Sequence, residues 1–119
     1  MNVAVIGASD KPHRYSYKAV QLLQEKGHRV FPVHPRVKTV RGIPVYPSFS
    51  EIPEDIDTIT FYVGAEKSTA MSEDILERAV RRLIFNPGAE NPDLGSRARE
   101  KGIEVLEACT LVMLRTNQF

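Results

Sequence analysis

Apolar runs alternate with helical patterns along the whole chain. The first run covers residues 3–6 and stops at Gly7, and a helical pattern over about 16–26 then closes on Gly27. A short, uninterrupted apolar run is typical of a central strand in a parallel sheet. A strand, a glycine turn and a helix in this order predict a β-α unit at the start of the chain.

The same alternation predicts the later elements. We expect strands over 28–33, 42–46, 58–63, 82–85 and 103–106, and helices over about 65–80, 91–102 and 108–114. Pro32 and Pro35 should break the ladder of the second strand and open a loop. Asn91-Pro92-Asp93 is a typical helix start, because Asn caps the free N–H groups and proline suits the first turn.

Strands that alternate with helices predict an α/β fold with a doubly wound parallel sheet in three layers. We expect one domain over residues 1–119 with strand order 3-2-1-4-5-6. In such a sheet a ligand crevice opens above the carboxyl ends of strands one and four. Those ends lie at Gly7 and at Val63-Gly64.

Composition narrows the class of protein. The 16 basic and 15 acidic residues give a net charge of +1, without a dense basic block, so we expect no nucleic-acid partner. No apolar run is long enough to span a bilayer and no secretory leader is visible, so we expect a cytoplasmic protein with no membrane partner. Cys109 is the single cysteine and the three histidines are scattered, so we expect no disulfide and no metal site.

The loop after the first strand carries groups that suit a phosphate. Gly7 allows close backbone approach, and Ser9, Lys11, His13 and Arg14 follow it near a helix N-terminus. A dinucleotide fingerprint would place glycine where Ser9 and Pro12 stand, and an acidic residue after strand two. That strand is instead followed by basic residues, namely Arg36, Lys38 and Arg41. A ribose with an extra phosphate is therefore favoured, which leaves NADP and coenzyme A (CoA).

Two segments carry a resemblance to a known family. Gly7-Ala8-Ser9-Asp10-Lys11-Pro12 with Arg14 and Ser16, followed by Pro32-Val33-His34-Pro35, resembles the stand-alone CoA-binding protein family. That family is similar to the CoA-binding domain of the succinyl-CoA synthetase α subunit. The resemblance implies a Rossmann-like domain that binds CoA or an acyl-CoA. His34 stands where the family usually has Asn, and Phe85-Asn86-Pro87-Gly88 replaces its usual Trp-Leu-Gln-x-Gly.

The resemblance also implies roles for particular residues. The backbone of Gly7, Ala8 and Ser9 would meet the pyrophosphate, with help from the Ser9 hydroxyl and Arg14. The segment Val33, His34, Pro35 and Arg36 would flank the adenosine, and Arg36 or Lys38 would meet the ribose 3′-phosphate. Val63 and Gly64 would let the ligand pass close to the sheet, and Asn86 to Gly88 would line the pantetheine path.

The resemblance implies binding without catalysis, because the ligases of this type carry their reactive histidine and nucleotide site on further domains. A carrier, a sensor or a thiol-protecting protein would fit. Two alternatives stay open. One is a small NADP-dependent oxidoreductase with Tyr62 or Lys67 as proton donor. The other is an interaction module without a ligand, acting through its surface or as a homodimer.

Overall fold

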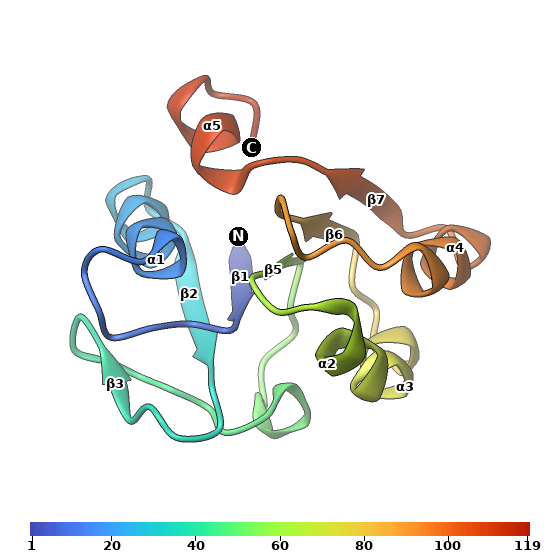
Figure 1. Ribbon diagram of the computed structural model, residues 1–119, viewed down its shortest axis with the longest axis horizontal. Helices are drawn as coiled ribbons and strands as arrows, with labels where there is room; N and C mark the ends of the chain where they lie inside the picture. The colour runs from blue at the N-terminus through green and yellow to red at the C-terminus, as the bar shows by residue number, and fades with distance from the viewer.

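A computed structural model describes residues 1–119 and has a five-stranded parallel sheet at its centre (Figure 1). The strands run in the order β2-β1-β5-β6-β7, with every neighbouring pair parallel. Their bounds are β1 Asn2–Ile6, β2 Arg29–Val33, β5 Thr58–Phe61, β6 Arg82–Phe85 and β7 Glu104–Glu107. The helices are α1 Tyr15–Glu25, α2 Ala65–Ala70, α3 Ser72–Glu77, α4 Pro92–Glu100 and α5 Thr110–Arg115, with a short 3-10 turn η1 at Phe49–Glu51.

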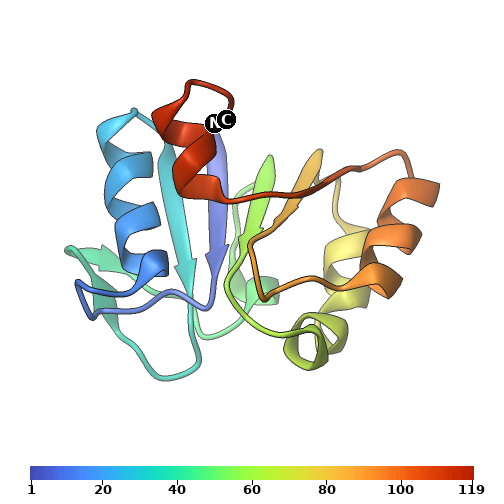
Figure 2. The ribbon, with the colours of Figure 1, turned by 45° about the horizontal axis from the view of Figure 1, so that its top comes forward.

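Helices cover both faces of the sheet, as the turned view shows (Figure 2). Alternate residues of each strand point to opposite faces, so β1 sends Ala4 and Ile6 to one side and Val3 and Val5 to the other. The first side packs against η1, α3 and α4, and the second against α1 and α5. None of the helices has the length and apolar character needed to span a bilayer. The predicted three-layer, Rossmann-like α/β fold is confirmed.

The predicted strand order is wrong in one respect, because the third strand does not join the sheet in full. Its segment folds as an antiparallel hairpin of β3 Thr39–Val40 and β4 Ile43–Pro44. Arg41 and Gly42 at its tip have φ of 51° and 78°, the positive values that a tight two-residue hairpin turn requires. Only Tyr46 reaches the sheet, through a single parallel bridge to Val33.

Pro32 does not break the second strand as predicted; it lies within β2, opposite Val5. Its carbonyl accepts a hydrogen bond from the Tyr46 N–H at 2.9 Å, on the side away from β1. The N–H that proline lacks would point to that same outer side, so the ladder with β1 loses no bond. This is the edge position at which a strand tolerates proline.

The helix predicted over 65–80 is two short helices, α2 and α3, separated at Met71. At the break, the Ser72 hydroxyl donates to the Ser68 carbonyl at 3.4 Å. Such a bond from a serine back to the preceding turn bends helices. This side-chain bond accompanies a division of the helix that hydrophobic spacing does not reveal.

The predicted start of α4 is confirmed at Asn91. Its side-chain oxygen accepts a hydrogen bond from the Leu94 N–H at 3.1 Å, and Pro92 follows in the first turn. Its side-chain nitrogen donates to the hydroxyls of Ser68 at 2.7 Å and Thr69 at 2.9 Å. One buried amide therefore caps α4 and ties it to α2.

We expect Asn91→Ala to lower the free energy of unfolding by about 1–3 kcal/mol, because it removes a helix cap and leaves the buried Ser68 hydroxyl without its donor. Asn91→Asp keeps the capping oxygen and loses the donors, so its loss should be smaller. Urea denaturation of the three proteins measures both differences. An Asn91→Ala protein as stable as the wild type would contradict this account of the cap.

Candidate functional site

A cleft of about 850 Å³ lies at the carboxyl ends of β1 and β5. Its walls come from the loop after β1, the start of α1, the loop after β2, and the segment from the end of β5 into α2. The crevice was predicted at this place. The structure gathers most of the residues predicted for the site in this cleft: Gly7, Ala8, Ser9, Lys11, Arg14, His34, Arg36, Lys38 and Val63.

The other predicted residues lie elsewhere. Asn86 lines an adjacent cavity, whereas Val33, Pro35, Gly64 and Gly88 line neither of the two. The cleft also includes residues that the sequence does not predict for a CoA site, namely Asp10, Tyr15, Ser16, Val37, Thr39, Tyr62 and Lys67. Two of them, Tyr62 and Lys67, are predicted only as proton donors of the oxidoreductase alternative. The position of Lys67 in the first turn of the helix after a central strand is the signal that could place it in this cleft.

Gly7 lets the loop after β1 pass close to the end of β5. Its φ is +87°, and a Cβ added to it would lie 2.8 Å from Val63 Cγ1 and 2.9 Å from the Tyr62 carbonyl oxygen. Any other residue would therefore be strained and would clash there. The N–H groups of Gly7 and Ala8 both donate to the Val33 carbonyl, at 3.0 and 3.1 Å. These two residues shape the cleft, but their N–H groups are already bonded.

Backbone N–H groups without a hydrogen-bond partner follow Gly7 and Ala8 along the chain. The N–H groups of Ser9 and Asp10 make no hydrogen bond within the chain, and neither do those of the first turn of α1, from Tyr15 to Tyr17. Arg14 occupies the N-cap position of α1 without a capping side-chain bond. Free N–H groups at a helix N-terminus favour an anion. Tyr15 and Ser16 line the cleft, so these donors border it.

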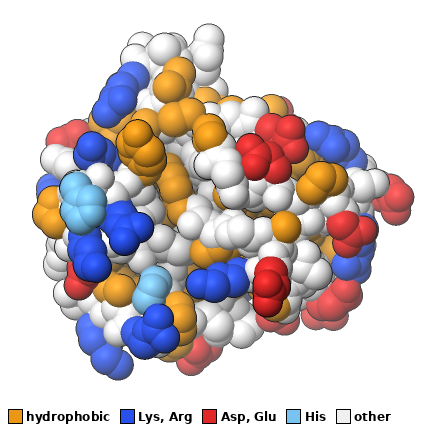
Figure 3. Space-filling view, in the orientation of Figure 1, with side chains coloured by type: hydrophobic (Ala, Val, Ile, Leu, Met, Phe, Trp, Pro, Cys, Tyr) orange, Lys and Arg blue, Asp and Glu red, His pale blue; other side chains and the backbone are white.

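The charge of the cleft is strongly positive. Five cationic side chains line it, namely Lys11, Arg14, Arg36, Lys38 and Lys67, and none of them forms an ion pair within the chain. Asp10 is the one carboxylate in its wall. Basic side chains gather on the side of α1 and β3, and acidic ones mainly on the side of α2, α3 and α4 (Figure 3). The arrangement suits a ligand with several negative charges.

Arg41, the third member of the basic cluster in the sequence, does not line the cleft. Its guanidinium donates to the Gln24 side chain at 3.2 Å and to the Tyr17 hydroxyl at 3.4 Å. The same group lies 5.8 Å from the centre of the Tyr17 ring. Arg41 therefore joins the β3–β4 hairpin to α1.

His34 builds the turn that carries Arg36. Its Nδ1 accepts hydrogen bonds from the N–H groups of Arg36 at 3.0 Å and Val37 at 3.2 Å. The neutral ring then carries its proton on Nε2, which remains a donor. Burial, followed by the charges of Arg36 and Lys67, lowers the pKa of His34 below its ordinary value. A histidine thus takes the acceptor role that an asparagine can take in such a turn.

Tyr62 lies between the cleft and the second cavity. Its hydroxyl is buried and has no hydrogen-bond partner within the chain. The nearby hydroxyls of Thr60 and Thr110 bond each other at 2.7 Å. Burial raises the pKa of Tyr62 to about 12. A phenol with so high a pKa gives up its proton reluctantly, so Tyr62 is poorly suited to general acid–base work near neutral pH.

The second cavity has a volume of about 400 Å³ and shares Tyr15 and Tyr62 with the cleft. Asn86 lies in its wall but directs its amide into the protein. The amide nitrogen donates to the Thr60 hydroxyl at 2.7 Å and the Phe61 carbonyl at 2.8 Å, and the oxygen accepts from the Thr110 N–H at 2.8 Å. Asn86 therefore fixes the start of α5 to the end of β6.

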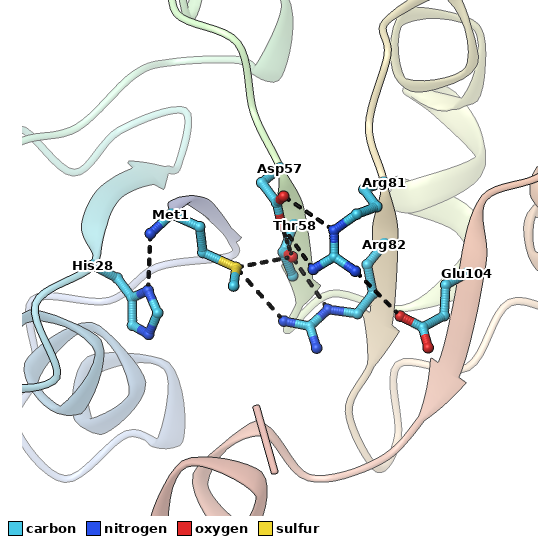
Figure 4. A network of polar contacts seen from close by, with 7 residues as sticks. All are labelled: Met1, His28, Asp57, Thr58, Arg81, Arg82 and Glu104. Atoms are coloured by element: carbon cyan, nitrogen blue, oxygen red, sulfur yellow. Dashed lines mark hydrogen bonds and ion pairs between the residues drawn. The ribbon is translucent and has the colours of Figure 1, made fainter. Parts of the chain in front are cut away.

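A polar network lies at the opposite, amino ends of the strands (Figure 4). Buried Arg82 donates to the Thr58 hydroxyl at 3.2 Å and stacks 4.4 Å from the Phe119 ring, and burial lowers its pKa. Arg81 pairs with Asp57 at 3.1 Å and with Glu104 at 3.7 Å. This network joins β5, β6, β7 and the two termini, and it lies away from the cleft. No group of three or more His, Cys, Asp or Glu side chains is placed to hold a metal ion.

Comparison with known proteins identifies the class. The model of the CoA binding domain family matches residues 1–115, and the chain belongs to that family. Among relatives, the uncharacterized protein YneT of Bacillus subtilis is 28% identical over 104 residues, which are 87% of this chain and 77% of YneT. A crystal structure of an uncharacterized protein superposes with a TM-score of 0.92 at 34% identity, covering 99% of this chain and 97% of that one.

The chain is also similar to part of a larger protein. The α subunit of ADP-forming acetate–CoA ligase II from Pyrococcus furiosus is 28% identical over 106 residues, which are 87% of this chain. The match spans only 23% of that subunit. The likeness therefore concerns one region of the ligase subunit, which agrees with the resemblance read from the sequence.

The lowered pKa of His34 predicts a pH effect on stability. The unfolded chain takes up a proton at the ordinary histidine pKa of 6.5, before the folded chain does. The contribution of His34 to stability is therefore lost as pH falls through this value toward the folded pKa. We expect His34→Asn, which keeps a side-chain acceptor for the turn, to weaken the pH dependence of the unfolding free energy between about pH 7.5 and about pH 5.5.

Denaturant titrations of both proteins across that range measure the effect. The pKa of His28 is lowered too, but His28 is present in both proteins and so cancels in their difference. Identical pH profiles would show that His34 titrates alike in the folded and unfolded chains.

Proposed function

We propose that the protein binds CoA or an acyl-CoA in the cleft above β1 and β5, and that it acts as a carrier, a sensor or a thiol-protecting protein without catalysing a reaction itself. The observation that supports this most is the set of five unpaired cations around a glycine loop with free N–H groups. CoA carries a pyrophosphate and a ribose 3′-phosphate. Family membership points to the same ligand.

In this proposal the pyrophosphate meets Ser9, the N-terminus of α1 and Arg14, and the ribose 3′-phosphate meets Arg36 or Lys38. The adenosine lies against the turn built by His34. Gly7 and Ala8 act by close approach, because their N–H groups are bonded to Val33. Val33 itself acts through that carbonyl, and Pro35 and Gly64 through the course of the backbone beside the cleft.

The chemistry of Tyr62 and Lys67, the two proton donors of the oxidoreductase alternative, favours a binding role over an NADP-dependent oxidoreductase. The raised pKa of Tyr62 makes it a poor proton donor. Lys67 lines the cleft together with four other cationic side chains, so its ammonium group is placed to meet a phosphate of the ligand. An interaction module without a ligand would have no need of five unpaired cations in one cleft, since unpaired like charges repel one another.

Ligand binding should raise the stability of the folded chain. At a ligand concentration 100 times Kd, we expect a gain of about 2.7 kcal/mol, seen as a rise in Tm. CoA and acetyl-CoA should produce this rise under reducing conditions, with a smaller one for dephospho-CoA and little for NADP or NAD. A shift with NADP alone would favour the oxidoreductase. No shift with any of the five would favour the interaction module.

The Arg36→Glu substitution tests the contact with the 3′-phosphate. Charge reversal should weaken CoA binding about tenfold or more and dephospho-CoA binding much less, because only CoA carries the phosphate that Arg36 meets. Isothermal titration calorimetry measures both. Arg99→Glu, on the exposed side of α4, is the matched control and should change neither affinity. Equal losses for both ligands would place Arg36 against another part of the molecule.

A further inference from the structure

The second cavity differs in chemistry from the cleft. Aromatic and apolar side chains dominate its wall, with Tyr15, Tyr62, Pro87 and Leu111 among them. The amide of Asn86 is fully bonded to Thr60, Phe61 and Thr110, so it offers little to a ligand. Arg115, at the end of α5, is the one charged side chain in the wall. The cavity is thus an apolar space with one cation at its border.

Arg115 has no partner within the chain. It is exposed, and its guanidinium forms neither an ion pair nor a hydrogen bond with another residue. A guanidinium beside an apolar wall is well suited to a carboxylate, because it can donate two parallel hydrogen bonds to the two oxygens. The cavity holds no acidic side chain that would compete for it.

The position of the cavity relates it to the cleft. Tyr15 and Tyr62 line both spaces, so a long ligand with its phosphates in the cleft can continue past these two rings into the cavity. At about 400 Å³ the cavity is within the usual size of a small-molecule site. The phosphates bind at the cationic end, so the end that reaches the cavity is the thiol end with its acyl group.

We propose that the second cavity holds the acyl group of the ligand, and that Arg115 selects acyl groups that end in a carboxylate. This inference rests on the proposed function, because it requires that CoA lies in the cleft. It adds the substrate class: thioesters of dicarboxylic acids, in preference to thioesters of simple fatty acids. The apolar wall contacts the methylene chain, and Arg115 binds the terminal carboxylate.

Matched pairs of thioesters test the selection. Malonyl-CoA and propionyl-CoA have the same chain length, as do glutaryl-CoA and valeryl-CoA, and each pair differs in a terminal carboxylate against a methyl group. Calorimetry should give at least one carboxylated member about two- to fivefold tighter binding than its partner, the gain typical of an ion pair with an exposed arginine. The chain length that shows the larger preference reports the distance from the thiol end to Arg115.

Substitution of Arg115 completes the test. Arg115→Gln should abolish the preference within that pair and change the Kd of CoA itself less than about twofold. Arg115→Lys should keep part of the preference, because it retains the charge without the paired donors. Arg99→Gln, an exposed arginine of α4, is the control and should leave every affinity unchanged.

Two results would overturn the inference while leaving the proposed function intact. One is equal binding of both members of each pair by the wild type. The other is an Arg115→Gln protein that loses affinity for CoA as much as for the carboxylated thioesters, which would place Arg115 against a part common to all the ligands. Failure of CoA and of all four thioesters to bind would instead overturn the proposed function, and this inference with it.

Discussion

The carbonyl of Val33 holds the cleft in shape, because it accepts hydrogen bonds from the N–H groups of both Gly7 and Ala8. These bonds fasten the loop after β1 to the end of β2. On the other side, Gly7 passes so close to Val63 and the Tyr62 carbonyl that no side chain fits. These contacts on both sides fix the course of the loop as it leaves the sheet. They leave the N–H groups of Ser9 and Asp10, which come next in the loop, without a partner in the chain.

The two faces of the sheet are built differently, and the difference matters for the second cavity. One face is apolar, and the rings of Phe61 and Phe85 stack on it with centroids 4.7 Å apart. The other carries buried polar groups, among which Thr60 and Asn86 bond the start of α5. Hydrogen bonds have directions that apolar contacts lack, so they hold α5 in one position. That position brings the end of α5, with Arg115, to the border of the cavity.

The sequence predicts those features that depend on local pattern. The β-α units, the Asn91 cap and the glycine loop all follow from residues within a few positions of one another. Three other features do not follow from local pattern. The third segment pairs with itself as a hairpin, Pro32 is tolerated because its carbonyl faces the outer side of β2, and the Ser72 hydroxyl bonds the preceding turn at the break. The site shows the same division: the loop of Gly7 was predictable, whereas the inward bonds of Asn86 and the turn of Arg41 away from the cleft were not.

The amino-acid composition does not reveal how unevenly charge is distributed over the molecule. A net charge of +1 gives no sign of a site for a multiply charged anion. The fold separates the charges, so that five unpaired cations share one cleft while acidic residues gather mainly on the side of α2, α3 and α4 (Figure 3). At physiological salt the screening length is about 8 Å, so a ligand at the cleft responds to its near cations far more than to the distant acids. The local arrangement of charge, and not its sum, therefore determines which ligands the protein attracts.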